Sequence, residues 1–371
     1  MRLIKINLFS CKTPFLLAFK SAHLSRASSD SVLIELAFDN GVTGWGESAP
    51  RPYVTGETTV SVVRLIKELF SSILFHNEID SIQDVENILD LLEQECQSRN
   101  IISFRSALGC CDIALLDALG NHTHKHITEF LGPVQRTDIP YSFSVPLAPL
   151  SFMVRYKEII EKTNIKHFKI LMAPDPTENY ERVHFVRSQF GDSADIRVEA
   201  NGHWTVGQAL ANLNRLKDSG ISAVEQPVAA HDLEGLQIIR KETGVPVIVD
   251  ESMCSLNDAE KLISKRACDI LNIKISKCGG LLRSKRIADF ARSHGVRIQL
   301  GAHVGETKIL SKAGESFVKT VPEVVCYEGC SPLLFGGTIE QEKSPSPDLR
   351  PGLGDHIDKK NLAPMLSIDF R

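Results

Sequence analysis

The sequence predicts an α/β protein, a (β/α)7β modified TIM barrel that follows a smaller N-terminal α+β domain. From residue 138 onward, short apolar runs alternate with amphipathic stretches of helical period, as in parallel βα units. The eight runs are IPYSFSV, HFKILMA, IRVEAN, AVEQPV, VIVDES, ILNIKIS, RIQLGAH and VVCYEG. Residues 1–125 instead place strands before helices, which is typical of an α+β domain.

The apolar runs are evenly spaced. Polar residues at their ends recur every 24 to 29 positions, the length of one βα unit, at Glu199, Glu225, Asp250, Lys274 and His303. Eight such units favour a closed barrel over an open doubly wound sheet, which usually carries a Gly-rich phosphate turn that this chain lacks. The stretch GGTIEQEKSPSPDLRPGLGDHIDKK after the eighth run has no helical period, so we expect the last helix to be missing.

Three segments follow from this pattern: an α+β capping domain at 1–125, the barrel at 126–335, and a C-terminal segment at 336–371 that returns toward the first domain. Within 1–125 we expect strands at RLIKINLFS and SVLIELAFDNGVTGWGE, and helices near 57–75, 81–98 and 103–119.

Composition excludes several classes of protein. With 43% hydrophobic and 24% charged residues, the 371-residue chain resembles an ordinary globular protein. Its net charge of −4 gives no basic field for nucleic acid, and the apolar FLLAF near the start is too short to cross a membrane. Nine cysteines without a CxxC pair fit a protein of the reduced cytoplasm. We also expect the protein to be a homo-oligomer.

Three acidic residues end three consecutive strands. In such a barrel the carboxyl ends of the strands form the active face, so Glu199, Glu225 and Asp250 would converge there. Carboxylates this close repel one another unless a cation holds them, and oxygen ligands favour Mg²⁺, with Mn²⁺ as a substitute. The alternative is that each acid caps the next helix or pairs with a lysine.

Lys274 ends the next strand, inside an apolar, β-branched run where a buried strand normally carries Val or Ile. A partly desolvated lysine near a metal has a lowered pKa and can act as a base near neutral pH. The alternative is a structural counter-ion to the carboxylates. Lys277, three residues on, is expected to support the CGG loop at the substrate-binding site.

Several motifs resemble those of one family, in order along nearly the whole chain: GVTGWGESAP, ALGCCDIALLDALGN, VEANGHW, VEQPV, VDES and NIKISKCGG. They resemble the enolase superfamily, in particular the muconate lactonizing enzyme subgroup of the mandelate racemase/muconate lactonizing enzyme family. The resemblance implies metal ligands at Glu199, Glu225 and Asp250, a catalytic Lys274, and a cap whose loops near 18–27 and 48–56 close over the substrate.

The chain departs from the subgroup's pattern in two places. The second strand usually carries a Lys-x-Lys pair, but here Lys169 is followed by Leu171 where the second lysine belongs. Lys169 lies on the same strand face, roughly 6 to 7 Å further back, and remains a catalytic candidate. The third-strand ligand is usually Asp rather than Glu, as at Glu199.

Three further residues are candidates by resemblance. In mandelate racemase relatives a histidine at the place of His303 acts as a base, so His303 could share proton transfer with Lys274; the alternative is a structural histidine. Glu306 resembles an acid found near the substrate carboxylate. Arg26 in the cap loop could meet that carboxylate, or could be a solvated loop arginine.

These features lead to a Mg²⁺-dependent enzyme that moves a proton α to a carboxylate of a small substrate through an enolate. We expect a muconate cycloisomerase-like isomerase first. The alternatives are an o-succinylbenzoate synthase-like dehydratase (a lyase), a racemase or epimerase of amino-acid derivatives, and a catalytically silent carboxylate-binding relative. Dipeptide epimerases tend to carry Asp-x-Asp on the eighth strand, where this chain has CYEGCS, which argues against them.

Overall fold

The structure is a computed structural model that describes residues 1–20, 25–147, 165–330, 350–354 and 362–370, with a few positions between these ranges. Part of the cap loop predicted near 18–27 and most of the segment predicted at 336–371 lie outside the described residues.

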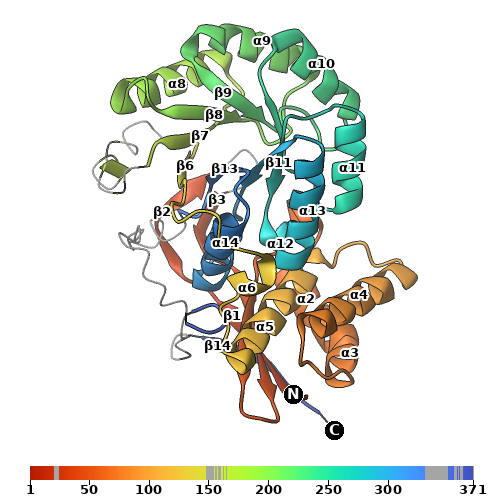
Figure 1. Ribbon diagram of the computed structural model, residues 1–371. Helices are drawn as coiled ribbons and strands as arrows, with labels where there is room; N and C mark the ends of the chain where they lie inside the picture. The colour runs from red at the N-terminus through yellow and green to blue at the C-terminus, as the bar shows by residue number, and fades with distance from the viewer. Residues whose placement is uncertain are drawn as a thin grey trace.

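The predicted barrel is confirmed. Eight strands form one parallel sheet in the order of the chain: β6 (Ser142–Val145), β7 (His167–Leu171), β8 (Asp195–Glu199), β9 (Ile221–Glu225), β10 (Val247–Val249), β11 (Ile270–Ile273), β12 (Arg297–Leu300) and β13 (Val324–Tyr327). A parallel bridge between Tyr141 and Tyr327 joins the first strand to the last. The sheet therefore closes on itself, with helices around it (Figure 1).

The barrel helices follow the strands: α8 (Pro176–Phe190), α9 (Val206–Leu216), the short 3₁₀ turn η2 (Lys217–Ser219), α10 (Leu233–Thr243), α11 (Leu256–Ser264), α12 (Ile275–Cys278), α13 (Leu281–Ser293) and α14 (Lys308–Thr320). Their ends follow local chemistry, since the Thr205 side chain accepts from the Gln208 amide at the start of α9 and Gly244 ends α10 in the left-handed conformation. Up to residue 330, the described chain shows no helix after β13.

The cap domain contains the antiparallel sheet β14-β1-β4-β5. Its strands are β1 (Leu3–Cys11), β4 (Ser31–Phe38), β5 (Thr43–Ser48) and β14 (Ala363–Asp369), and β2 (Pro14–Lys20) pairs with β3 (Ser25–Ser28) in a separate hairpin. The helical elements are α1 (Pro52–Thr55), α2 (Thr59–Leu65), the π-helical turn η1 (Ile66–Phe70), α3 (Ser71–Phe75), α4 (Ile82–Ser98), α5 (Arg105–Thr123) and α6 (Thr128–Leu131). The C-terminal strand β14 pairs with β1, so the end of the chain lies on the cap sheet.

Helix α5 lies between the cap sheet and the barrel. Its residues from Ser106 to Gly120 are all buried, which is typical of a helix packed on every side. Gly46 of β5 permits the close approach, because a Cβ there would lie 1.9 Å from the Cys110 carbonyl oxygen.

Two buried carboxylates of the cap bind the amino ends of barrel helices. The amides of Leu281 and Leu282, at the start of α13, donate to Asp112 at 2.7 and 3.2 Å. Glu47 accepts from the Thr307 and Leu310 amides, at the start of α14, at 2.8 and 3.1 Å. These amides have no partner within their own helix, so the cap satisfies them and fixes its position over the barrel mouth.

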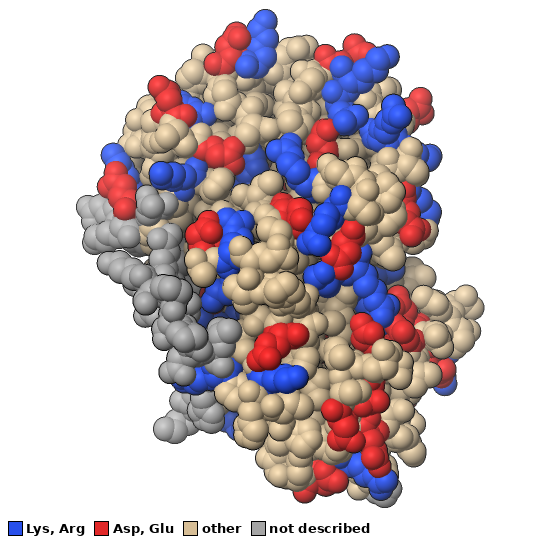
Figure 2. Space-filling view, viewed as in Figure 1, with Lys and Arg blue, Asp and Glu red and all other residues tan. Residues whose placement is uncertain are grey.

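The surface agrees with the low net charge. On the face shown in Figure 2, blue and red side chains are interspersed over the barrel helices. No described helix combines the length and apolar character needed to cross a membrane.

The Asp112 contacts give a stability prediction. Replacing Asp112 by Ala leaves the two buried amides of α13 without partners, which should lower the free energy of unfolding by about 1–3 kcal/mol. Urea denaturation measures the change. Asp289→Ala is the matched control, because Asp289 lies exposed on α13 and pairs with Lys285. Equal free energies of unfolding for the two variants would contradict a stabilising role of Asp112 between the cap and the barrel.

Candidate functional site

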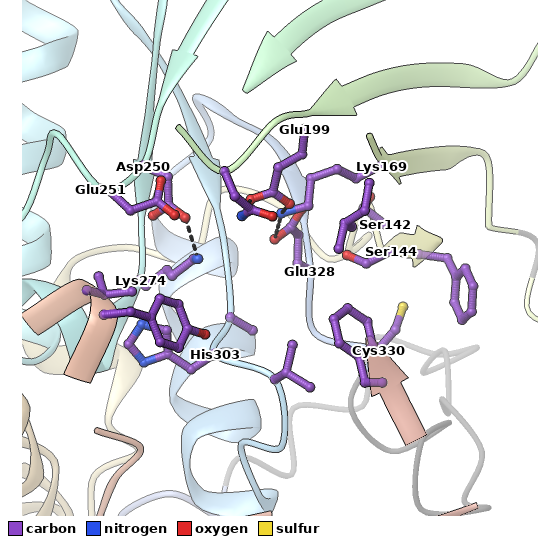
Figure 3. A pocket seen from close by; sticks show the side chains of 18 residues that line it. Ser142, Ser144, Lys169, Glu199, Asp250, Glu251, Lys274, His303, Glu328 and Cys330 are labelled. Atoms are coloured by element: carbon purple, nitrogen blue, oxygen red, sulfur yellow. Dashed lines mark hydrogen bonds and ion pairs between the residues drawn. The ribbon is translucent and has the colours of Figure 1, made fainter. Parts of the chain in front are cut away.

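A cavity lies at the carboxyl ends of the barrel strands, under the cap. It is lined by strand-end residues and by Phe19, Tyr53 and Val54 of the cap. The space that the centres of water molecules can occupy in it has a volume of about 80 Å³. Figure 3 shows Lys274, Asp250 and Glu251 gathered on one side, and Lys169, Glu199 and Glu328 meeting on the other. The predicted convergence of strand-end residues is therefore observed.

Strand order decides which groups face one another. In the closed sheet β7 and β11 are four strands apart in either direction, so they lie opposite each other. Leu171 is the last residue of β7, while Lys274 directly follows β11 and His303 follows the neighbouring β12. Lys274 and His303 therefore share one side of the cavity, and Leu171 occupies the other.

Asp250 is held between two lysines. Its Oδ2 accepts from Lys274 Nζ at 2.6 Å, and its Oδ1 accepts from Lys277 Nζ at 2.7 Å. Burial alone would raise the pKa of Asp250, but the attraction of Lys274 and Lys277 lowers it well below its usual value.

Lys277 does not contact the cavity. It is fully buried, and its ammonium also donates to the backbone oxygens of Asp250 and Asn272. The structure therefore gives Lys277 a positioning role behind Asp250, in place of the expected substrate contact. The short helix α12 turns the lysine back onto the end of β10.

The expected lowering of the Lys274 pKa was made for a lysine beside a bound metal and stays a prediction. In the structure burial lowers this pKa, but Asp250 at 2.6 Å, together with Glu199 and Glu225, raises it above its usual value. Lys274 is thus an ammonium group in the structure, a form that donates a hydrogen bond or a proton.

Lys169 lies among three carboxylates. Its Nζ is 2.9 Å from Glu199, 3.2 Å from Glu225 and 2.8 Å from Glu328. Burial alone would lower the pKa of this amine, but the three acids raise it well above its usual value. Glu328 was not predicted from the sequence, although its place directly after β13, in CYEGCS, was a usable signal.

Glu225 has its carboxylate oxygens engaged by protein donors. Oε1 accepts from Asn272 Nδ2 at 2.8 Å in addition to Lys169, and Oε2 accepts from Gln299 Nε2 at 2.8 Å. These donors come from β7, β11 and β12, so the side chain points toward the barrel interior. Glu225 lies beside Glu199, since Lys169 contacts both, and metal binding by Glu225 stays a prediction.

Glu251 lies close to Glu199 and Asp250. One carboxylate oxygen from each of the three residues lies within 4.8 Å of the others, close enough to hold one metal ion. Glu251 Oε2 is buried without a hydrogen-bond partner, and burial raises the pKa of Glu199 to about 8 and that of Glu251 to about 7. Such oxygens fit a cation, since Mg²⁺ prefers carboxylate ligands and would offset the cost of their burial.

His303 lines the cavity and has one ring nitrogen without a hydrogen-bond partner. Its side chain is buried, and Nδ1 lies 2.7 Å from the Ala49 carbonyl oxygen, which can only accept, so Nδ1 carries the hydrogen. Nε2 is then a lone-pair acceptor, and it has no partner. Burial, reinforced by Lys274 and Arg51, lowers the pKa of His303 well below its usual value, so the ring is neutral.

The two other predicted substrate contacts lie outside the cavity lining. Glu306 is buried behind His303, where it accepts from the His303 amide at 2.6 Å, and burial raises its pKa to about 8. Arg26 lies in β3, and its Nε is buried without a hydrogen-bond partner. Glu306 thus supports the loop that carries His303, and substrate binding by Arg26 stays a prediction.

Comparisons with known proteins identify the family. A model described as the mandelate racemase / muconate lactonizing enzyme N-terminal domain matches residues 4–132, and one described as enolase C-terminal domain-like matches residues 152–361. An N-succinyl-L-Arg/Lys racemase from Bacillus cereus is 26% identical over 98% of this chain and 97% of its own. Its crystal structure has a TM-score of 0.89 and covers 100% of both chains at 25% identity.

Two further relatives extend the comparison. An L-Ala-D/L-Glu epimerase from Clostridium acetobutylicum is 32% identical over 76% of this chain and 77% of its own. A dipeptide epimerase from Enterococcus faecalis, solved with Mg and the dipeptide L-Leu-L-Tyr, shares the fold with a TM-score of 0.83, 24% identity and coverage of 98% and 100%.

These relatives are racemases and epimerases, which supports an enzyme activity for the chain and favours the racemase or epimerase alternative over the cycloisomerase expected first. Both halves of the chain match the family's models, and the 32% identical relative is covered over most of its length. The chain belongs to the mandelate racemase / muconate lactonizing enzyme family of the enolase superfamily.

Proposed function

We propose that the protein is a divalent-cation-dependent enzyme that removes the proton from the carbon next to a carboxylate of a small substrate. The observation that carries the proposal is one buried cavity in which Lys274 and His303 stand beside the carboxylate group of Glu199, Asp250 and Glu251. Cation ligands and proton-transfer groups side by side suit this chemistry, because proton removal places negative charge on the substrate carboxylate.

Glu199, Asp250 and Glu251 would hold the cation, with Mg²⁺ as the first choice. A bound cation supplies positive charge that stabilises the negative charge developing on the substrate carboxylate. The chain's own residues support this placement: Lys277 fixes Asp250 from behind, and Asn201 Nδ2 donates to Glu199 Oε1 at 2.5 Å.

Proton transfer is assigned to Lys274 and His303. The hydrogen bond from Nδ1 to Ala49 fixes the histidine tautomer, so Nε2 is free to accept a proton from the cavity. Lys274, as an ammonium group, can return a proton on the same side. Lys169, held by three carboxylates, balances their charge in the absence of substrate.

The substrate class follows from the relatives' activities. N-succinyl amino acids and dipeptides both contain an acylated α-amino group next to a carbon that carries a hydrogen and a carboxylate. We therefore propose an N-acylated amino acid as the substrate.

Proton exchange tests the function. In D₂O with Mg²⁺, wild type should introduce deuterium at the α carbon of at least one N-succinyl amino acid or dipeptide, as measured by ¹H NMR. Lys274→Ala and His303→Gln should each slow this exchange by roughly 10²–10⁴-fold, the usual contribution of an acid–base group. Lys241→Ala, an exposed change on α10, should match wild type. Binding of these substrates without exchange in wild type would instead indicate a silent carboxylate-binding protein.

Metal binding separates the two candidate third ligands. Glu251→Gln should weaken Mn²⁺ binding roughly tenfold or more, because it removes an unpartnered carboxylate oxygen from the group. Glu225→Gln is the matched control and should weaken binding less, because protein donors already occupy its oxygens. Titration followed by electron paramagnetic resonance of free Mn²⁺ gives both affinities. The reverse order of effects would restore Glu225 as the ligand.

A further inference from the structure

We infer that this enzyme transfers the α proton on one face of the substrate only, so that exchange proceeds with retention of configuration, and that Leu171 determines this outcome. The inference rests on the proposed function and deepens it. It separates this chain from relatives named as racemases and epimerases, since inversion needs a proton to arrive on the face opposite to the one it left.

The proton-transfer groups Lys274 and His303 share one side of the cavity. Lys274 follows β11 and His303 follows the adjacent β12, so both approach a bound substrate from the same side. Tyr53 of the cap also lines the cavity; burial raises its pKa, and among the charged groups Lys274 has the largest effect on it. Leu171, at the end of the opposite strand β7, has no proton to give.

Phe19, Leu171 and Val304 form an apolar part of the cavity lining. Leu171 is 3% exposed and packs with Phe15 and Phe19 of the cap hairpin, with Val304 against the same cluster. The end of β7 is thus covered by apolar side chains of the cap.

The side of the cavity at the end of β7 also carries polar groups. Glu199 pairs with Leu171 across β7 and β8, and its carboxylate is one of the three that would hold the cation. The other proton-bearing lining residues near β7 in strand order are Lys169 and Cys330, together with two serine hydroxyls, which are poor acids. Lys169 sits two residues behind Leu171 and points its ammonium at Glu199, Glu225 and Glu328. Burial and then Glu328 raise the pKa of the Cys330 thiol, so a thiolate left after proton donation would be unfavourable.

The chemical step is then simple. The α carbon–hydrogen bond breaks, its electron pair moves into the carboxylate, and the proton passes to the Lys274 and His303 side. Re-formation of the bond takes a proton or solvent deuteron from the same side, so the starting configuration returns. No oxidant or second reactant is needed.

One experiment distinguishes this inference from the proposed function. Optically pure N-acylated L-amino acids are incubated in D₂O with Mg²⁺, deuterium is followed by ¹H NMR, and configuration is followed by chiral chromatography. The expected result is deuterium incorporation at least tenfold faster than loss of optical purity. Exchange and inversion at equal rates would overturn the inference and leave the proposed function intact. No exchange at all would overturn both.

Variants at position 171 test the assignment to Leu171. Leu171→Lys places an amine opposite Lys274, and inversion should become at least tenfold faster relative to exchange than in wild type. Leu171→Met, an apolar change of similar volume, should keep retention. A folded Leu171→Lys enzyme that still exchanges without inversion would remove Leu171 as the determinant. If Leu171→Lys fails to fold, the wild-type measurement decides the stereochemical claim by itself.

Discussion

Buried charge at the barrel mouth is the constraint on which the site depends. Acidic and basic side chains from six strands meet where little water reaches them, and a buried charge is tolerated only with a partner. Lys169 satisfies this for Glu199, Glu225 and Glu328, and Lys274 and Lys277 satisfy it for Asp250. Glu251 keeps an unpartnered oxygen, so the network is complete on the side of Lys169 and open for a cation beside Asp250.

The same network makes the cavity chemically asymmetric. Lys274 follows β11 and His303 follows β12, so both lie on one side of the cavity. The nearby carboxylates keep Lys274 charged, and burial keeps His303 neutral, with Nδ1 bonded to Ala49. At the end of β7 the cavity wall is apolar, because Leu171 packs against Phe15 and Phe19 of the cap. Since the cap is fixed to the barrel by buried Glu47 and Asp112, this asymmetry is built into the fold.

The sequence alone predicted much of this arrangement. An even period of strands and helices specified the barrel, and the carboxyl-end rule brought Glu199, Asp250, Lys274 and His303 together. The direction of Glu225 could not be predicted, because it depends on donors at Asn272 and Gln299 on other strands. Nor could the Lys274 pKa, which depends on burial and on how close Asp250, Glu199 and Glu225 lie in space. Glu251 was overlooked because sequence position does not show which carboxylate lacks a hydrogen-bond donor.

The central claim is that charge stabilisation by a cation in this carboxylate group makes α-proton removal feasible. The most direct test is the rate of deuterium exchange into an N-acylated amino acid by wild-type enzyme, measured first with a chelator and then after excess Mg²⁺ is restored. The account predicts that exchange falls to background with the chelator and returns with Mg²⁺. Exchange that continues unchanged in the chelator, with the enzyme shown to be free of metal, would contradict it.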